Sequence, residues 1–208
     1  MIRRALLTVM TLGMLIPTAW GSKRVALTFD DGPSGRFTQR LLDGLEQRQV
    51  RATFFLCGYR MEDYGELATR IAEDGHEIGI HGYSHDPMCT MDAETLAREI
   101  DQTQCLLERY TGKRWQLLRP PGGNCSELVK QAAASRNLEL VLWTVDPQDW
   151  AVHDARAVAE HVLERVENGD IILLHDMSDS SVDAALMIVD GLLARGFQFV
   201  TVSELRGK

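Results

Sequence analysis

Short apolar runs alternate with longer segments of helical periodicity from residue 23 to the end of the chain. The apolar runs predict seven β-strands, at residues 24–29, 52–56, 77–80, 116–118, 138–145, 170–174 and 198–202. The segments between them predict six helices, at residues 38–48, 62–73, 92–110, 126–135, 154–168 and 182–195. Strands that alternate with helices in this way are typical of an α/β fold with a parallel sheet.

Most of the predicted strands are apolar throughout rather than alternately apolar and polar. Such strands are typical of a sheet that is covered on both faces. No low-complexity linker and no repeat interrupts the alternation of strands and helices. We therefore expect a single domain over residues 22–208.

The composition is that of a globular protein without a nucleic-acid partner. The chain has 208 residues, of which 45% are hydrophobic, and this is enough to form a sizeable core. Its formal net charge is −8, and no basic run follows residue 24. Because nucleic-acid binders need clustered Lys and Arg to contact phosphates, we expect no partner of that class.

The first 21 residues have the pattern of a signal peptide. Arg3 and Arg4 precede an apolar stretch at residues 5–19, and the small residues Ala19 and Gly21 occupy the positions that a signal peptidase inspects. Cleavage there predicts a secreted or cell-wall-associated protein with no stable membrane insertion. The alternative is a retained anchor, although the apolar stretch is shorter than the ~20 residues that span a bilayer.

The four cysteines are Cys57, Cys89, Cys105 and Cys125, and none of them forms a C-x-x-C pair, so a structural zinc knuckle is not expected. In an oxidising compartment they can form disulfides in any of three pairings, and Cys89 with Cys125 is one candidate. Cys105 lies opposite the apolar stripe of its predicted helix, so we expect an exposed thiol or a bridge partner there.

Polar side chains directly follow five of the predicted strands. They are Asp30 and Asp31 after the first strand, His81 and His85 after the third, the sequence RPPGG at residues 119–123 after the fourth, Asp146, Asp149 and Trp150 after the fifth, and His175 and Asp176 after the sixth. In parallel β/α folds, ligands bind where strands end and the following loops begin. We therefore expect these side chains to converge on one site.

The groups that follow the first and third strands predict a metal site. The adjacent carboxylates of Asp30 and Asp31 repel each other, which favours a cation nearby. His81 and His85 are four residues apart, so both rings can turn toward one centre. Two histidines and one aspartate form a three-ligand site that leaves a position for water, and the second aspartate can then act as a base. The alternative for the aspartate pair is a turn with helix capping.

Five motifs together resemble those of the polysaccharide deacetylases of the NodB homology type, carbohydrate esterase family four. They are TFDDGPS at residues 28–34, HGYSHD at 81–86, RPPGGN at 119–124, DPQDW at 146–150 and ILLHD at 172–176. The resemblance extends over residues 23–206, with the motifs in the order of the family. It implies an α/β fold, a distorted (β/α) barrel of about seven parallel strands, and metal-dependent removal of acetyl groups from N-acetylated or O-acetylated glycans.

The resemblance also implies a role for each matching residue. Asp30 corresponds to the catalytic base and Arg119 to the arginine that holds this base. His175 corresponds to the general acid and Asp146 to its carboxylate partner. The metal ligands correspond to Asp31, His81 and His85, the acetyl pocket to Trp150 and Leu173, and the donor of an N–H to the oxyanion to Gly122. The cofactor expected from the resemblance is one divalent ion, zinc first, with cobalt or another divalent ion as alternatives.

Two positions depart from the family pattern. Gly82 stands where many members have Ser or Thr, which puts the stiffness of the loop between the two histidines in doubt. Gly122 stands where many members have Tyr, so an aromatic wall is missing from that part of the site.

Peptidoglycan, at its N-acetylglucosamine or N-acetylmuramic acid residues, is the expected substrate. Acetylated xylan and chitin oligosaccharides are the alternatives within the enzyme class. A glycan-binding domain without turnover is the alternative of another class, and the complete set of motif residues argues against it.

Overall fold

The computed structural model describes residues 23–208, so the predicted signal peptide at residues 1–21 lies outside the described residues. The strands are β1 (Lys23–Asp30), β2 (Thr53–Leu56), β3 (Glu77–Ile80), β4 (Leu117–Leu118), β5 (Glu139–Leu140), β6 (Ile171–His175) and β7 (Phe197–Phe199). The helices are α1 (Arg36–Gln47), α2 (Gly58–Glu73), α3 (Ala93–Thr111), α4 (Glu127–Ala134), α5 (Ala155–Arg165), α6 (Asp179–Ala194) and α7 (Val202–Leu205), with 3₁₀ turns η1 (Met88–Thr90) and η2 (Pro121–Gly123). The seven predicted strands and six predicted helices are confirmed, with shifts at their ends.

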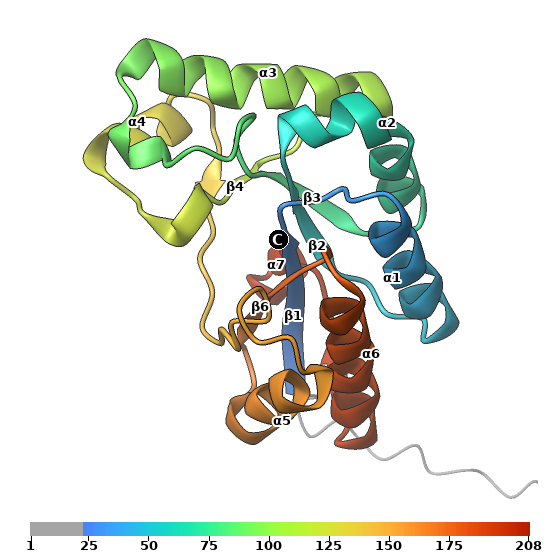
Figure 1. The fold of residues 1–208 in the computed structure, drawn as a ribbon. Helices are drawn as coiled ribbons and strands as arrows, with labels where there is room; N and C mark the ends of the chain where they lie inside the picture. The colour runs from blue at the N-terminus through green and yellow to red at the C-terminus, as the bar shows by residue number, and fades with distance from the viewer. Residues whose placement is uncertain (1–22) are drawn as a thin grey trace, which may run out of the picture.

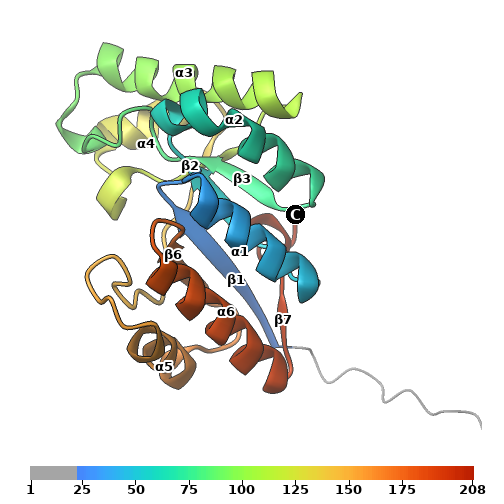
Figure 2. The same ribbon diagram turned by 45° about the vertical axis from the view of Figure 1, so that its right-hand side comes forward.

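The strands form one parallel sheet in the order β5-β4-β3-β2-β1-β6, and β7 pairs with the beginning of β1. After β5 the chain crosses from one edge of the sheet to the other. The Val141 N–H donates to the Leu118 carbonyl at 3.0 Å, and four residues later the Val145 carbonyl accepts from the Leu173 N–H at 2.9 Å. This crossing joins β4 to β6 and gives the sheet the form of a distorted, partly closed barrel, with the helices on its outside (Figures 1 and 2).

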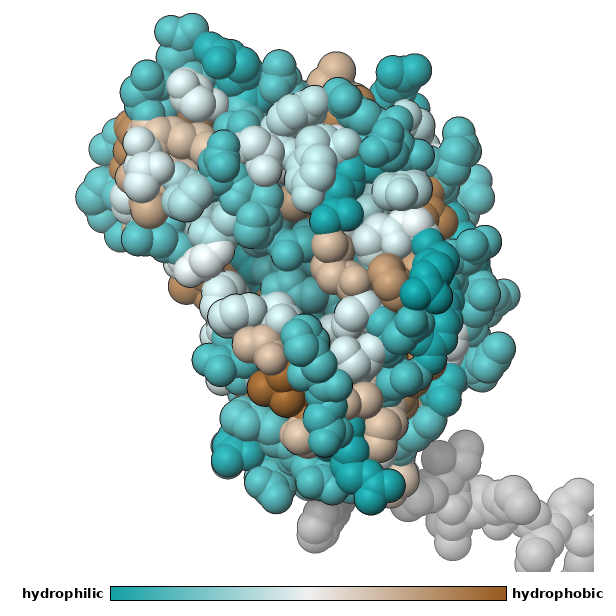
Figure 3. Space-filling view, viewed as in Figure 1, coloured by the Kyte–Doolittle hydropathy of each residue, from teal (hydrophilic) through white to brown (hydrophobic). Residues whose placement is uncertain are grey.

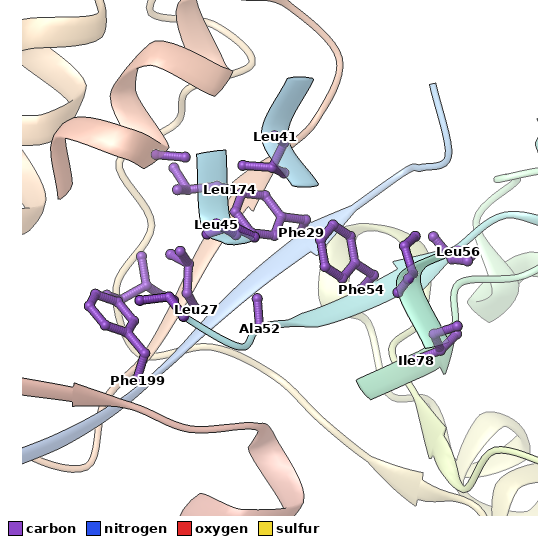
Figure 4. Close-up of a cluster of buried hydrophobic side chains, with 14 of the residues drawn as sticks. Leu27, Phe29, Leu41, Leu45, Ala52, Phe54, Leu56, Ile78, Leu174 and Phe199 are labelled. Atoms are coloured by element: carbon purple, nitrogen blue, oxygen red, sulfur yellow. The ribbon is translucent and has the colours of Figure 1, made fainter. Parts of the chain in front are cut away.

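The side chains of β1 alternate between two buried environments. Leu27 and Phe29 point toward the helices, where they pack with Leu41 and Leu45 of α1 (Figure 4). The ring of Phe29 stacks on that of Phe54 from β2, with 5.1 Å between the centroids. Ala26 belongs to a smaller apolar cluster on the opposite face, which Thr28 and Asp30 share by the period of the strand. Burial of both faces accounts for the uniformly apolar strands of the sequence.

Two predicted strands differ from the structure. The run predicted as a strand over residues 138–145 is regular only at β5, because the chain leaves β4 there to reach β6. The last predicted strand, over residues 198–202, ends at Phe199. Thr201 instead caps α7, because its hydroxyl accepts the Glu204 N–H while the Glu204 carboxylate accepts the Thr201 N–H. This capping box is the helix signal that the strand prediction ignored.

The cysteines are unbridged in the structure, so the candidate pair Cys89 and Cys125 is not formed. Cys105 is exposed, as its position on the helix predicts, whereas Cys57 is buried. Within residues 23–208, no helix combines the length and the apolar character needed to span a membrane.

Candidate active site

The polar strand ends converge around a cavity of about 270 Å³. Asp31, Asp149, Trp150, His153, His175, Met177, Ser178 and Ser181 line it. The molecular face that Figure 3 presents is hollowed near its centre, where hydrophilic residues predominate. The loops after β1, β5 and β6, which lie far apart in sequence, thus form one site, as the parallel architecture predicts.

Asp31, His81 and His85 come together as the sequence predicts. The Asp31 Oδ1 atom lies 3.3 Å from Nε2 of His81 and 2.9 Å from Nε2 of His85, and the three candidate ligand atoms lie within 4.8 Å of one another. Asp31 and His85 both have left-handed backbones, with φ of 71° and 69°. Non-glycine residues seldom adopt this conformation, and it is concentrated at functional sites. The local backbone is therefore bent in the way that brings these side chains together.

The arrangement fits a cation. His81 is buried, and its Nδ1 lies 2.7 Å from the Arg119 carbonyl oxygen. A carbonyl only accepts hydrogen bonds, so Nδ1 carries a proton, and Nε2 is the atom that faces Asp31 Oδ1. Two electron-rich atoms at this distance need a proton or a cation between them, and an imidazole fixed by an outer acceptor is the usual form of a metal-bound histidine.

The pKa shifts of Asp31 and His85 also favour a cation in this cluster. Burial alone would raise the pKa of Asp31, but the contacts with His81 and His85 outweigh it and hold the pKa well below its usual range. The hydrogen bond to the Asp31 carboxylate in turn raises the pKa of His85, so positive charge is favoured at this position. A divalent ion at this position would meet a carboxylate and two imidazoles, which is a donor set suited to zinc.

Asp30 is held beside this cluster by Arg119. The guanidinium is fully buried, and its Nη1 donates to Asp30 Oδ1 at 2.7 Å and to Thr28 Oγ1 at 2.8 Å. It also lies 4.0 Å from the centroid of the Phe55 ring. Burial lowers the pKa of Arg119, but Asp30 opposes the shift, and an arginine stays charged in a protein. One carboxylate oxygen of Asp30 is thereby fixed, while Oδ2 faces His81 Nε2 at 3.7 Å.

His175 pairs with Asp149, which corrects the sequence-based assignment of Asp146. Asp149 is almost completely buried, and its two oxygens accept the His175 Nδ1–H at 2.8 Å and the His175 backbone N–H at 2.9 Å. Burial opposes a charge on His175, but the hydrogen bond and charge of Asp149, helped by Asp30 and Asp31, raise its pKa to about 9. The ring is a cation at neutral pH, and Asp149 fixes its orientation.

Asp146 has a local role instead. Its Oδ1 accepts the Gln148 N–H at 2.8 Å, an Asx turn that uses the carboxylate within its own loop. It lines a separate cavity of about 360 Å³ with His161 and Arg165. Both aspartates of DPQDW follow the same strand, and only the path of the loop decides which of them reaches the histidine.

Of the remaining predicted residues, Trp150 lines the cavity, whereas Leu173 and Gly122 are not among the residues that line it. Trp150 is 62% exposed at its rim, and Leu173 is buried two residues before His175, on the same face of β6. Gly122 lies in η2 after Arg119 and has a left-handed backbone with φ of 68°. A Cβ added there would meet no atom within 4 Å, so the space beside Gly122 is open.

Asp176 supports the turn that follows the aspartate pair, a role that the sequence analysis missed. It is completely buried, and its Oδ2 accepts from the hydroxyl of Thr38, which itself accepts the Ser34 N–H at 2.7 Å. A Cβ at Gly32 would lie only 2.8 Å from Asp176 Oδ1, so the turn needs a glycine. Burial raises the pKa of Asp176 to about 6, against the effect of the Thr38 hydrogen bond.

Comparison with known proteins agrees with this site. A family model for polysaccharide deacetylases matches residues 19–141. The chain is 36% identical to the peptidoglycan-N-acetylmuramic acid deacetylase PdaC of Bacillus subtilis, over 88% of this chain and 38% of that protein. It is 37% identical to a peptidoglycan-N-acetylglucosamine deacetylase of Bacillus cereus, over 88% of each chain. The chain thus spans well under half of the first relative and most of the second.

Solved structures extend the similarity to the fold. A structure of the peptidoglycan deacetylase PdaC from Bacillus subtilis aligns with a TM-score of 0.85 and 35% identity, over 89% of this chain and 90% of that one. A structure described as a family-four pseudoenzyme from Bacillus anthracis aligns with a TM-score of 0.83 and 26% identity, over 88% of this chain and 65% of that one. Turnover therefore has to be argued from the residues of the site, because the fold is common to both kinds of protein.

Proposed function

Because the chain belongs to the polysaccharide deacetylase family, we propose that it is a metal-dependent hydrolase that removes acetyl groups from the acetamides of an N-acetylated glycan. The observation that supports the proposal most strongly is that two sets of polar groups lie on different sides of one site. A fixed carboxylate and a metal-type cluster lie on the side of β1 and β3, and a charged histidine lies on the side of β6.

Asp31, His81 and His85 are the residues that would hold the cation, with zinc as the first candidate. When bound, such an ion supplies a Lewis acid that polarises the amide carbonyl and makes a water molecule easier to deprotonate. Gly122 is the proposed source of an N–H for the oxyanion that develops on the carbonyl.

Asp30 is the proposed base. Arg119 fixes one of its oxygens, so the other is directed toward the His81 side of the cavity, where the attacking water would lose its proton. A base held in one orientation avoids the loss of side-chain freedom at the moment of reaction. Arg119 is therefore a positioning residue for Asp30.

His175 is the proposed acid. The amide nitrogen that leaves the acetyl carbon needs a proton, and His175 carries one at neutral pH because Asp149 stabilises its cationic form. With Nδ1 bound to Asp149, the Nε2–H is the proton available for transfer. Trp150 and Leu173 are the proposed walls of the pocket for the acetyl methyl group.

Peptidoglycan is the proposed substrate, because the two relatives described above are named for its N-acetylmuramic acid and N-acetylglucosamine residues. Action on this polymer requires the enzyme to work outside the cytoplasm, in agreement with the predicted signal peptide at residues 1–21.

Mass spectrometry of the reaction products tests the proposal. The chain from Ser22 to Lys208 is incubated with muropeptides, acetylated chitin oligomers and acetylated xylan, each with added zinc and with a chelator. We expect loss of 42 Da per acetyl group, roughly the mass difference between acetyl and hydrogen, from muropeptides with zinc only. Asp30→Asn serves as the control with strongly reduced turnover. No loss from any substrate in the presence of bound zinc would favour a glycan-binding domain instead.

A further inference from the structure

The loop that joins the two candidate histidine ligands is held by a carboxylate from another part of the chain. Glu99 lies on α3, and its Oε2 accepts the backbone N–H of Tyr83 at 2.7 Å and that of Ser84 at 2.8 Å. These amides lie midway between His81 and His85. Hydrogen bonds to a charged acceptor are stronger than those between neutral groups, so the pair is a firm restraint on the loop.

The opposite polar groups of the same loop are held by α2. The Gly58 N–H donates to the Gly82 carbonyl at 2.9 Å, and the Tyr59 N–H donates to the Tyr83 carbonyl at 3.0 Å. The first N–H groups of a helix have no partner within the helix, and here they find one in the loop. The backbone of residues 82–84 is therefore fixed on its carbonyl side by α2 and on its amide side by Glu99.

Gly82 gives the Glu99 carboxylate the room that it needs. A Cβ at Gly82 would lie 3.3 Å from Glu99 Oε2 and 3.0 Å from the terminal methyl carbon of Met88. The backbone of Gly82 is also left-handed, with φ of 81°. The absence of a side chain at position 82 therefore does not leave the loop without a restraint. The Glu99 carboxylate occupies the space beside Gly82 and accepts hydrogen bonds from the next two backbone amides.

His85 depends on this loop more than His81 does. His81 has a side chain that is 2% exposed and is anchored by the Arg119 carbonyl, whereas the His85 side chain is 45% exposed. The position of its ring is set by a left-handed backbone one residue beyond Ser84. A shift of the loop would therefore move Nε2 of His85 away from Asp31, while His81 would stay in place.

We propose that Glu99 is a positioning residue for the metal site, which keeps the loop of residues 82–84 in the form that directs His85 toward Asp31. The inference rests on the proposed function, in that it takes Asp31, His81 and His85 as the ligands of a cation. Outer partners that orient metal ligands typically contribute 10–100-fold to metal affinity. Most such outer partners bond to the imidazole of the ligand itself, whereas Glu99 acts through the backbone amides of the loop.

Zinc binding to the purified chain tests the proposal, measured by competition with a chromophoric chelator. We expect Glu99→Ala and Glu99→Leu to weaken zinc binding by about 10–100-fold. Glu99→Gln keeps an acceptor oxygen, so we expect it to recover most of the affinity. Glu94→Ala is the matched control: Glu94 lies on the same helix and pairs only with the exposed Arg98 among the ion pairs of residues 23–208, and its removal should change the affinity less than about twofold.

Hydrogen exchange of the metal-free protein gives a second readout. The amides of Tyr83 and Ser84 should lose protection in Glu99→Ala and keep it in Glu99→Gln and Glu94→Ala. If Glu99→Ala does not fold, Glu99→Leu, which has a similar volume and no acceptor, takes its place.

The outcomes separate this inference from the proposed function. Zinc affinity that is the same in the wild type, Glu99→Ala and Glu99→Leu would overturn the positioning role and leave the proposed hydrolase intact. A wild-type chain that binds no zinc would overturn the cation site itself. A lower stability with unchanged zinc affinity would show that Glu99 serves only the fold.

Discussion

Two strands bring a histidine to the site, and the partner of each Nδ1 atom gives the two rings different chemistry. Directly after β3, the Nδ1–H of His81 donates to a backbone carbonyl at 2.7 Å, which leaves Nε2 facing Asp31. On β6, the Nδ1–H of His175 donates to the Asp149 carboxylate at 2.8 Å, and its pKa is raised to about 9. A carbonyl acceptor thus suits the proposed metal ligand, and a carboxylate acceptor suits the proposed proton donor.

A buried histidine outside the site shows the opposite shift. His76 lies before β3, at the end of the sheet opposite the site, and its Nδ1 accepts the Ala52 N–H at 3.0 Å. Burial lowers its pKa to about 4, so it is neutral and serves the fold. Since burial also opposes the charge on His175, the carboxylate of Asp149 is what distinguishes the two rings.

Removal of the histidine on β3 should have the largest effect. We expect His81→Ala to reduce activity to background and to weaken zinc binding by more than the ~100-fold that an outer partner contributes, because it removes one of three ligands. Zinc content and turnover of the same preparation provide the measurement. His161→Ala, on α5 and outside the cluster, should retain both, and full activity of His81→Ala would refute the assignment of the ligands.

Asp30→Asn should separate metal binding from proton transfer. The amide keeps the shape of the side chain but cannot act as a base, so we expect the rate to fall by about 10²–10⁴-fold while zinc stays bound. Steady-state kinetics and metal analysis of the variant check this. Loss of the zinc with the rate would place Asp30 among the ligands instead.

Asp149→Asn should alter the pH dependence of the reaction. The raised pKa of His175 keeps the acid protonated up to about pH 9, and activity is lost as the pH rises through that value. Without the carboxylate the pKa falls toward the ordinary value of 6.5, so the alkaline limb of the kcat profile should move to lower pH by at least about one unit. The rate at neutral pH should fall by about 10-fold or more.

Asp146→Asn is the matched control for this prediction. Asp146 precedes Asp149 by three residues and bonds only within its own turn among the contacts described for residues 23–208. We expect its pH profile to match that of the wild type. A shift in Asp146→Asn and none in Asp149→Asn would restore the assignment made from the sequence.

Asp176→Asn should have the smallest effect, on stability alone. The pKa of Asp176 rises from 3.8 to about 6 on folding, so the folded state binds the proton more tightly. The wild type therefore loses stability as the pH rises from about 4 through 6, by an amount on the order of 3 kcal/mol at 1.36 kcal/mol per unit. The asparagine does not titrate. Urea unfolding of both metal-free proteins at several pH values should show the variant gaining stability relative to the wild type across this range, whereas parallel curves would contradict the shift.

Strand ends were the part of the site that could be predicted from the sequence. Asp30, Asp31, His81, Arg119 and His175 each follow directly from an apolar run, and a parallel sheet brings such ends together whatever the loops do. The fold class followed from the same alternation. These features depend on periodicity, which a single sequence records well.

Residues that act from loops and helices could not be assigned in this way. Asp146 and Asp149 are the same residue type and follow the same predicted strand, and only the path of the loop decides which of them reaches His175. Glu99 binds backbone amides, and an amide carries no signature in the sequence. A carboxylate at another position on that face of α3 would look the same in the sequence. The contact between Glu99 and the two loop amides is therefore visible only in the structure.

The most direct test of the difference between the two histidines is the ring-nitrogen NMR spectrum of the zinc-loaded chain at pH 7.5, with His175→Gln used to assign the second ring. We predict that His175 carries protons on both nitrogens, and that His81 carries one on Nδ1 only, with Nε2 shifted by the metal. A neutral His175 at this pH, or a His81 with its proton on Nε2, would contradict the account.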